Sequence, residues 1–400
     1  MTSPSNDLPF EIVLLITSHL HYRVDLYHCA LINKQFYAAT IHRLWDDPMC
    51  GNDVSYLWHA PIYYGIPRHE SSNIACDGGI VTCSTLIQCL FKTRQYQHTN
   101  TLRSFPLGHY IRKLDFNDED LVTDSILLLS HTPFLEHLSL LGSPITDYDV
   151  ECIWQFCPRL KSIYLFDMSF EELVGIGNYC HQLTSFIFES DSLFNPAAAL
   201  AELQGCPLTC LSLARCEWYV EPTGARLSSE FDQLEIIYLV DCGHLTDEFF
   251  KILVPSATTF PSLTRLVLNN ASLTPETANL MMKCLPLLAD INIKLIQVVT
   301  NNILAALTSG PSLKIFDLQA AHYDVSSQGI RDIAIDSPQL TSLHIRGCSM
   351  PQRCFPEVDI GDDYISLNLD SLNKIRRNTG FRTTAYDDNR SDTSDSESSI

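Results

Sequence analysis

Residues 157–165 read CPRLKSIYL, and the same arrangement returns about ten times between Leu107 and Gly347. Each copy has an apolar residue at an anchor position, at the third position after it and at the fifth. The anchors are Ile111, Leu135, Leu160, Leu183, Leu208, Leu234, Leu263, Leu288, Leu313 and Leu340. Successive anchors lie 23 to 29 residues apart. This spacing indicates one structural unit that is repeated along the chain.

The spacing within each copy predicts a short strand, because residues two apart on a strand share a face and the residue between them points the other way. The chain after a strand opens with helix-start signals, since threonine caps helices and acidic residues or proline suit the first turn. These signals are Thr123-Asp124, Thr146-Asp147, Thr246-Asp247 and Thr274-Pro275. We therefore predict an α/β solenoid of stacked units, with parallel strands on the concave face and helices on the convex face.

Several cysteines occupy fixed positions in the repeat. Cys216, Cys242 and Cys348 lie eight residues after an anchor, and Cys157 and Cys180 lie three residues before one. This pattern resembles the cysteine-containing leucine-rich repeats found in F-box proteins. The resemblance implies a leucine-rich-repeat fold but not a particular ligand, because such solenoids bind many things.

A second unit precedes the repeats and begins LPFEIVLLITSHL at Leu8. Proline at its second position and Glu11 in the first turn are helix-start signals. The predicted helix is apolar nearly all round, so it must be buried on more than one side. Two further helical runs, one capped by Asp25 and one ending near Leu44-Trp45, are too short to wrap it alone.

The residues of this unit resemble an F-box in their order. The matching positions are Leu8-Pro9, Glu11-Ile12, Ile16, Leu20, Asp25-Leu26, Ile32, Lys34, Phe36 and Leu44-Trp45. Phe36 stands where that family usually has tryptophan, and Asn33 where it often has cysteine. The resemblance implies that an Skp adaptor contacts Leu8, Pro9, Glu11, Ile12, Ile16, Leu20 and Leu26. The alternative is a helical cap that packs only on its own solenoid.

The predicted organisation has six parts. They are a flexible N-terminus (1–7), the F-box (8–46), a connector with a helix (47–106), the solenoid (107–350), a C-terminal cap (351–382) and an acidic tail (383–400). The tail ends DDNRSDTSDSESSI and has no large apolar residue before Ile400, so we predict disorder. Within it, Ser394-Asp395-Ser396-Glu397 resembles a site for acid-directed kinases, although a solvated acidic tail is the favoured interpretation.

Composition narrows the classes of partner. The formal charge is −21, from 26 basic and 47 acidic residues, and it disfavours nucleic acid and anionic membranes. We found no secretion signal and no apolar run long enough to span a membrane, so we expect an intracellular protein, cytoplasmic or nuclear or both. The fifteen cysteines are odd in number and partly at repeat positions, which favours reduced, buried thiols over disulfides.

No catalytic, cofactor-binding or metal motif is present in the sequence. Cys206, Cys210 and Cys216 lack the spacing of a zinc site. His19, His21 and His28 have no nucleophile and carboxylate in a recognisable order. We expect a chain that is not an enzyme in itself, and a hydrolase or transferase in the loops has no motif to support it.

The resemblance implies the substrate receptor of an SCF-type (Skp–cullin–F-box) ubiquitin ligase, which holds a target protein on the repeats. The alternative is an interaction scaffold that delivers nothing for ubiquitination. Side chains between the two inward positions of each strand are predicted to line the concave face, and the apolar ones gather in the middle. The predicted target-binding residues are Tyr164, Phe166, Ile187, Tyr238, Val240, Arg265 and, on a long loop, Trp218 and Tyr219. If the register is off by one, or if helices or the cap cover the patch, these side chains are core residues instead.

Overall fold

The structure is a computed structural model of the 400-residue chain. It describes residues 8–48, 86–92, 106–116, 122–141, 147–166, 173, 175–194, 196–217, 231–243, 245–254, 260–320, 322–348, 350–358 and 364–378. The chain forms two compact units. The first comprises residues 1–191 and 201–207, and the second comprises residues 192–200 and 208–400.

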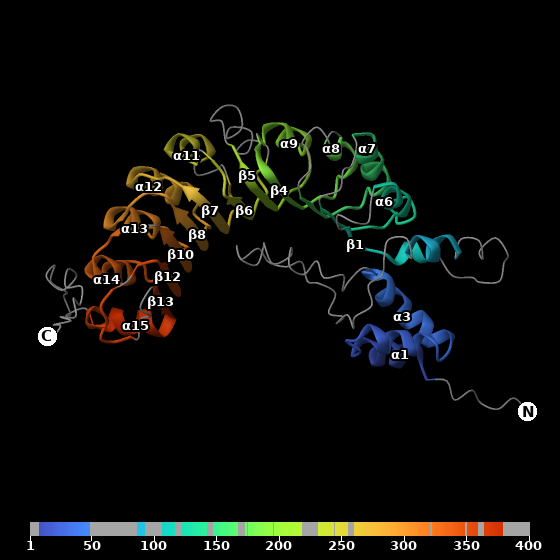
Figure 1. The fold of residues 1–400 in the computed structure, drawn as a ribbon. Helices are drawn as coiled ribbons and strands as arrows, with labels where there is room; N and C mark the ends of the chain where they lie inside the picture. The colour runs from blue at the N-terminus through green and yellow to red at the C-terminus, as the bar shows by residue number, and fades with distance from the viewer. Residues whose placement is uncertain are drawn as a thin grey trace, which may run out of the picture. The chain divides into compact units, whose positions relative to one another are not determined.

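The first unit opens with three helices, α1 (Phe10–Ser18), α2 (Arg23–Ala30) and α3 (Lys34–Asp46). Residues 86–92 are also helical, inside the predicted connector. Strands and helices then alternate (Figure 1). In order they are η2 (Leu107–Tyr110), β1 (Lys113–Phe116), α6 (Val122–Leu129), β2 (His137–Leu141), α7 (Asp147–Phe156), β3 (Ser162–Phe166) and α8 (Ile176–Tyr179). β4 (Ser185–Phe194) and α9 (Ala197–Glu202) span the boundary with the second unit. Strands β1 to β4 pair in parallel in sequence order.

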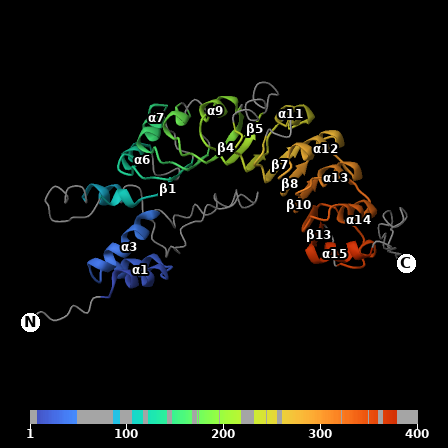
Figure 2. The same cartoon turned by 180° about the vertical axis from the view of Figure 1, so that it is seen from behind.

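The second unit repeats this alternation, and its repeat helices lie along one side of its strands (Figures 1 and 2). Its parallel strands are β5 (Cys210–Cys216), β6 (Ile236–Val240), β7 (Arg265–Ala271), β8 (Asp290–Leu295), β10 (Ile315–Ala320) and β12 (Ser342–Arg346). Its helices are α11 (Asp247–Leu253), α12 (Pro275–Cys284), α13 (Asn301–Leu307), α14 (Ser327–Asp336) and α15 (Leu369–Arg377). Two short strands, β9 (Val299–Thr300) and β11 (Tyr323–Asp324), pair with each other.

The repeat pattern in the sequence matches the structure residue by residue. All ten anchors are buried, and the repeat strands begin two residues after them. The apolar positions that follow an anchor, such as Ile163 and Leu165 after Leu160, are fully buried as well. The predicted α/β fold with parallel strands is therefore confirmed, and the shared core lies between strands and helices.

A left-handed residue recurs seven positions after the anchor, and the sequence pattern did not reveal it. Arg215, Asp241 and Asn270 have φ angles of 58°, 50° and 64°, and Gly347 has 81°. Asparagine, aspartate and glycine are the residues that adopt this region most readily. The amide Nδ2 of Asn270 donates to Oδ1 of Asp241 at 3.2 Å. These turns therefore link one repeat to the next at the end of the strands.

The predicted helix starts were partly right. The side chain of Thr274 accepts a hydrogen bond from the backbone N–H of Thr277, and proline takes the first helical position of α12. Thr246 precedes α11 but forms no capping bond with its side chain. Helix α6 begins at Val122, one residue before the predicted cap Thr123, and Thr146 lies outside the described residues.

Repeat cysteines lie in the core as thiols. Cys180 donates its Sγ–H to the carbonyl of Cys157 at 3.9 Å, and Cys206 donates to the carbonyl of Cys180 at 3.8 Å. Burial raises the pKa of Cys180 to about 12 and that of Cys206 to about 11. In the part of the chain that the structure describes, no cysteine forms a disulfide bond. Thiols with such a high pKa are poor nucleophiles at neutral pH.

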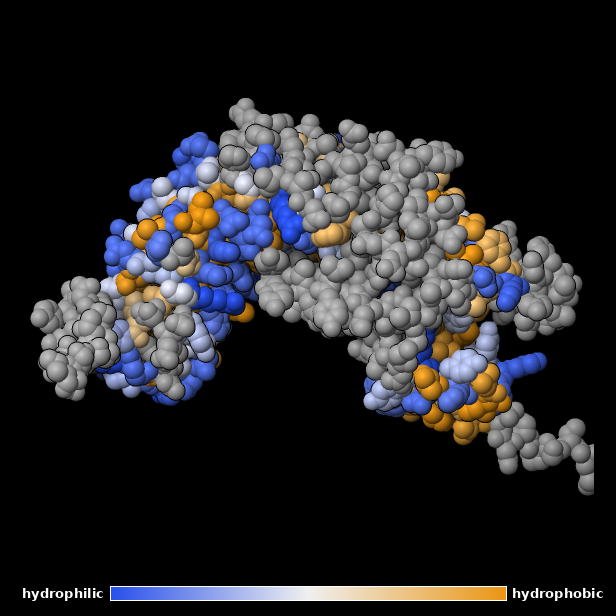
Figure 3. Space-filling view, in the orientation of Figure 1, coloured by the Kyte–Doolittle hydropathy of each residue, from blue (hydrophilic) through white to orange (hydrophobic). Residues whose placement is uncertain are grey.

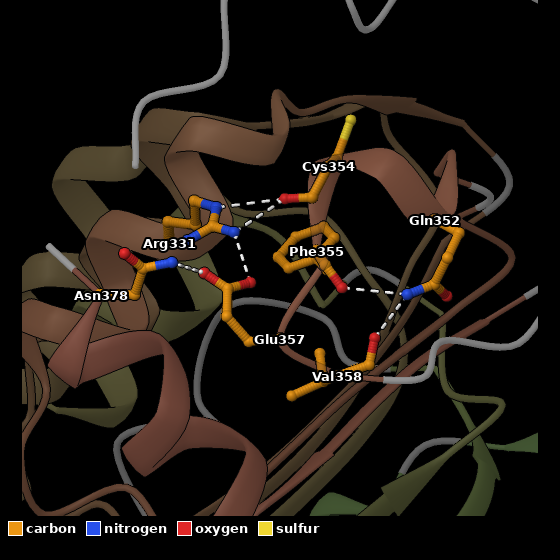
Figure 4. A network of polar contacts seen from close by, with 7 residues as sticks. All are labelled: Arg331, Gln352, Cys354, Phe355, Glu357, Val358 and Asn378. Atoms are coloured by element: carbon orange, nitrogen blue, oxygen red, sulfur yellow. Dashed lines mark hydrogen bonds and ion pairs between the residues drawn. The ribbon is translucent and has the colours of Figure 1, made fainter. Parts of the chain in front are cut away.

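The C-terminal end of the second unit is closed by a polar network (Figure 4). The guanidinium of Arg331 is 1% exposed and donates to the carbonyl of Cys354 and to Oε2 of Glu357, the latter at 2.7 Å. Asn378 donates to Oε1 of the same carboxylate at 2.7 Å. Burial by itself raises the pKa of Glu357, but these hydrogen bonds and the charge of Arg331 outweigh it and hold the pKa below its ordinary value.

The predictions for the two ends of the chain can be compared with the structure only in part. Helix α15 lies inside the predicted C-terminal cap. Strand β13 (Tyr364–Asn368), which pairs antiparallel with β12, was not predicted. The predicted flexible N-terminus 1–7 and the acidic tail 383–400 lie outside the described residues, and the six-part division of the chain stays a prediction.

Candidate functional site

The three N-terminal helices pack on one another through few residues. Val13 and Thr17 are the buried residues of α1, and α1 packs against α3. Arg43 of α3 donates to the carbonyls of Thr17 and Leu20 at the end of α1. These contacts fix α1 at one face and leave the remainder of its circumference open.

The open part of α1 is apolar. Leu8 is 46% exposed, Ile12 is 42% exposed and Ile16 is 40% exposed. Phe10, Leu14 and Leu15 are also exposed. Figure 3 shows this apolar surface in orange over the N-terminal helices. Soluble chains rarely expose so many neighbouring apolar side chains unless the surface binds a partner.

A second group of exposed apolar side chains lies on α2 and on the segments that flank it. Its members are Tyr22, Val24, Tyr27, Leu31 and Ile32. The sequence pattern did not single them out, apart from Ile32, although Val24, Tyr27 and Leu31 have the i, i+3, i+7 spacing of one helix face. Which of these side chains stay exposed depends on how the three helices pack, and only the structure shows it.

The predicted adaptor-binding residues divide into three groups. Leu8, Pro9, Glu11, Ile12 and Ile16 are exposed, and Leu20 is half-buried. Leu26 is fully buried on α2, which packs against α3. The side chain of Leu26 therefore belongs to the interior of the three helices, and its contact with an adaptor stays a prediction.

The predicted target-binding residues of the first unit are not open. Tyr164 is 2% exposed and Ile187 is 7% exposed, and both pack with the partly buried Phe166. The register is the predicted one, with Tyr164 opposite Ser139 and Ile187, so a slip by one residue does not explain the burial. The hydroxyl of Tyr164 donates to Oε2 of Glu189 at 3.5 Å. Burial, followed by the charge of Glu189, raises the pKa of Tyr164.

The same holds in the second unit. Tyr238 is fully buried and Val240 is 3% exposed. Arg265 lies over the Tyr238 ring, 5.6 Å from its centroid, and its Nε lies 3.2 Å from Oδ2 of Asp290. Burial raises the pKa of Asp290 despite the opposing charge of Arg265. The exposure that we predicted for Tyr164, Ile187, Tyr238 and Val240 is therefore wrong, and target binding by these residues stays a prediction.

Further along the second unit, the strand face opposite the core is open and polar. Asn292 and His344 are half-buried, and the side chain of Asp317 is 13% exposed. The ring nitrogens of His344 lie 2.8 Å from Oγ of Ser342 and 3.0 Å from Oγ of Ser366. Asp317 accepts a hydrogen bond from Arg346, so both Asp317 and His344 already have partners within the face, and the amide of Asn292 can bond a partner there. The predicted loop residues Trp218 and Tyr219 lie outside the described residues.

Two further features are absent from the described residues, namely a metal-binding cluster and a membrane-spanning helix. Among them, no group of histidine, cysteine and acidic side chains has the arrangement of a metal site. Likewise, no helix in the described ranges is long and apolar enough to cross a membrane.

Comparison with known proteins places the N-terminal helices in a family. A family model for F-box-like domains matches residues 5–50. A search of curated proteins found no match. Among solved structures, the yeast Rad7–Elc1 complex is similar at 16% identity and a TM-score of 0.34, over 66% of this chain and 83% of that one. An internalin (inlF) from Listeria monocytogenes is similar at 14% identity and a TM-score of 0.40, over 67% and 77%. Residues 5–50 thus carry an F-box-like domain.

Proposed function

We propose that this chain is the substrate-recognition subunit of an SCF-type ubiquitin ligase. The F-box-like domain binds an Skp adaptor and through it a cullin, and the repeats bind a target protein. Such a subunit forms and breaks no bonds itself, and it contributes to the rate of ubiquitination through proximity. It acts inside the cell, where the ubiquitin machinery is found.

One observation carries the proposal, namely the uncovered apolar face of α1 within a domain that matches the F-box-like family. Fully burying one Leu or Ile side chain is worth about 1.5–3 kcal/mol. Leu8, Ile12 and Ile16 are 46%, 42% and 40% exposed, so an adaptor groove that covers them gains a little under half of that value from each. Binding energy in interfaces usually concentrates in a few side chains of this kind.

The proposed target surface lies on the repeats. The open polar face of the second unit, around Asn292, Asp317 and His344, supports it better than the buried tyrosines do. A partner that uses this face would be held through hydrogen bonds and charge, which favour specificity over raw affinity.

Affinity purification from cells followed by peptide mass spectrometry tests the proposal. The wild-type chain is expected to recover an Skp-type adaptor together with a cullin. Recovery of the adaptor without a cullin would support the interaction scaffold instead. Recovery of neither protein would contradict the F-box role. Leu8→Ala with Ile12→Ala is expected to remove adaptor and cullin together.

A matched control comes from the repeats. Leu287 and Ile296 have the same chemistry and are 51% and 61% exposed. Leu287→Ala with Ile296→Ala should leave adaptor and cullin recovery unchanged. Equal losses for both pairs would show a general loss of folding rather than a docking surface on α1.

A further inference from the structure

Three neighbouring repeats of the first unit bring charged side chains together where the chain enters β1, β2 and β3. Arg112, Glu136 and Lys161 each directly follow an anchor. The backbone N–H of Glu136 donates to the carbonyl of Arg112, and that of Lys161 donates to the carbonyl of Glu136, both at 2.8 Å. These three residues therefore stack side by side, one from each repeat.

An aromatic ring holds two guanidinium groups beside this stack. Phe134 directly precedes the anchor of the middle repeat and is half-buried. The guanidinium carbon of Arg159 lies 4.3 Å from the centroid of its ring, and that of Arg112 lies 5.4 Å from it. A guanidinium that stacks on a ring is held in place and keeps the N–H groups at its rim available. We call five residues the arginine–phenylalanine surface, namely Arg112, Phe134, Glu136, Arg159 and Lys161.

This surface carries three cations and one carboxylate, on a chain with a formal charge of −21. Oε2 of Glu136 lies 2.7 Å from Nζ of Lys161, and its Oε1 lies 3.7 Å from Nε of Arg112. Burial by itself raises the pKa of Glu136, but the hydrogen bond from Lys161 and the neighbouring positive charges hold the pKa below its ordinary value. Glu136 is therefore charged at neutral pH, and its one negative charge is shared by two cations.

Arg159 supplies the positive charge that remains. It is exposed, and none of the residues that the structure describes forms an ion pair with it. A guanidinium has five N–H donors in a planar fork that fits a carboxylate, and the ammonium of Lys161 has three donors, of which Glu136 takes one. Asp46 and Lys113 also interact with this region, and their opposite charges cancel.

We propose that the arginine–phenylalanine surface binds an acidic segment of a partner protein, whose carboxylates contact Arg159 and Lys161. A nucleic acid strand carries a phosphate charge about every 3.4 Å, so it would extend from this surface over the rest of a negatively charged chain. A short acidic segment confines its charge to the surface itself. Charges are screened beyond about 8 Å at physiological ionic strength, so the net charge of the chain does not prevent this contact. The proposal stands whether or not the chain serves a ubiquitin ligase.

Binding of a dye-labelled hexaglutamate peptide to the purified full chain, measured by fluorescence anisotropy, tests the proposal. Arg159→Ala should weaken binding about tenfold, equivalent to about 1.4 kcal/mol, and leave the melting temperature unchanged because the side chain is exposed. Lys314→Ala is the matched control for Lys161→Ala, because Lys314 is exposed and also directly follows an anchor. Lys161→Ala should weaken binding about threefold, while Lys314→Ala should stay close to the wild type.

Two further variants distinguish a built surface from scattered positive charge. Phe134→Leu keeps every charge and removes the ring under Arg159, so binding should weaken about threefold. Glu136→Gln removes the carboxylate that competes for Lys161 and Arg112, so binding should tighten about threefold. Residues that matter only for folding would not give tighter binding when an ion pair is lost.

Three results would overturn the proposal. They are no measurable binding to the wild type, equal losses for Arg159→Ala and Lys314→Ala, or weaker binding in Glu136→Gln. Tighter binding of a single-stranded RNA of equal charge would assign the surface to nucleic acid instead. Leu8→Ala with Ile12→Ala should bind the peptide like the wild type, so a failure of the ligase proposal leaves this result unaffected.

Discussion

The helices α1 and α12 have similar lengths and many apolar side chains, yet their surroundings differ completely. Helix α12 buries Ala278, Met281 and Met282 against its neighbours in the stack. Helix α1 buries only Val13 and Thr17 and exposes Ile12 and Ile16 around them, next to the exposed Leu8 that precedes the helix. A repeat helix receives a covering partner from the next copy of its own sequence. Among the described residues, no such neighbour covers the F-box-like unit, which agrees with the proposed adaptor contact.

The largest expected effect on the free energy of unfolding distinguishes a buried tyrosine of the repeats from an exposed tyrosine of the F-box-like unit. Tyr238 of β6 is fully buried, and Tyr27 of α2 is 56% exposed. Tyr238→Ala should lower the free energy of unfolding by about 3–5 kcal/mol, because it leaves a cavity. Tyr27→Ala should change it by no more than about 0.5 kcal/mol. Chemical denaturation of both variants measures this. A stable Tyr238→Ala chain with altered partners would restore the original prediction of a target-binding tyrosine.

The second effect concerns the closing network of the repeats and depends on pH. Glu357→Gln should lower the free energy of unfolding by about 2 kcal/mol at pH 7, since it removes a charge from beside the buried Arg331. The pKa of Glu357 is below its ordinary value. Its contribution is therefore present above the unfolded pKa of about 4.3 and is lost as the pH falls through the lower folded pKa.

Denaturation at pH 7 and at several values below pH 4 measures the difference between Glu357→Gln and the wild type. The difference should shrink towards low pH. A difference that stays constant over this range would show that the carboxylate charge contributes nothing, and that shape alone matters at this position.

A smaller effect is expected from helix capping in the F-box-like unit. The side chain of Asn33 accepts from the backbone N–H groups of Gln35 and Phe36 at 2.9 and 3.0 Å. Asn33→Ala should therefore lower the stability of the three helices by about 1 kcal/mol. Thr246→Ala is the matched control, because Thr246 occupies a cap position without a capping bond. Equal thermal shifts for the two variants would contradict the role of the Asn33 side chain.

The repeats could be predicted from the sequence because their signal is periodic. Each anchor is followed at fixed distances by buried residues, and the recurrence of this pattern in about ten copies makes it recognisable even where single copies deviate. The antiparallel strand β13 has no repeat partner in the sequence, and nothing local distinguishes it from a loop. Its place follows only from pairing with β12.

The candidate sites were harder to predict, because exposure is a property of the whole fold. The position of Tyr164 and Tyr238 between two inward residues was correct. That position says which face they lie on, and it does not say whether the face is open. For the same reason Leu26 matched the family pattern and still proved to be buried.

The smallest expected change in stability accompanies the central claim about α1. Leu8→Ala with Ile12→Ala removes side chains that are 46% and 42% exposed, so the melting temperature should hardly move. Binding of a purified Skp-type adaptor, measured by titration calorimetry, should weaken at least about a hundredfold, or about 2.7 kcal/mol. The control Leu287→Ala with Ile296→Ala should bind within about twofold of the wild type. Wild-type affinity in the α1 double variant would contradict the claim that the open face of this helix is the adaptor-binding surface.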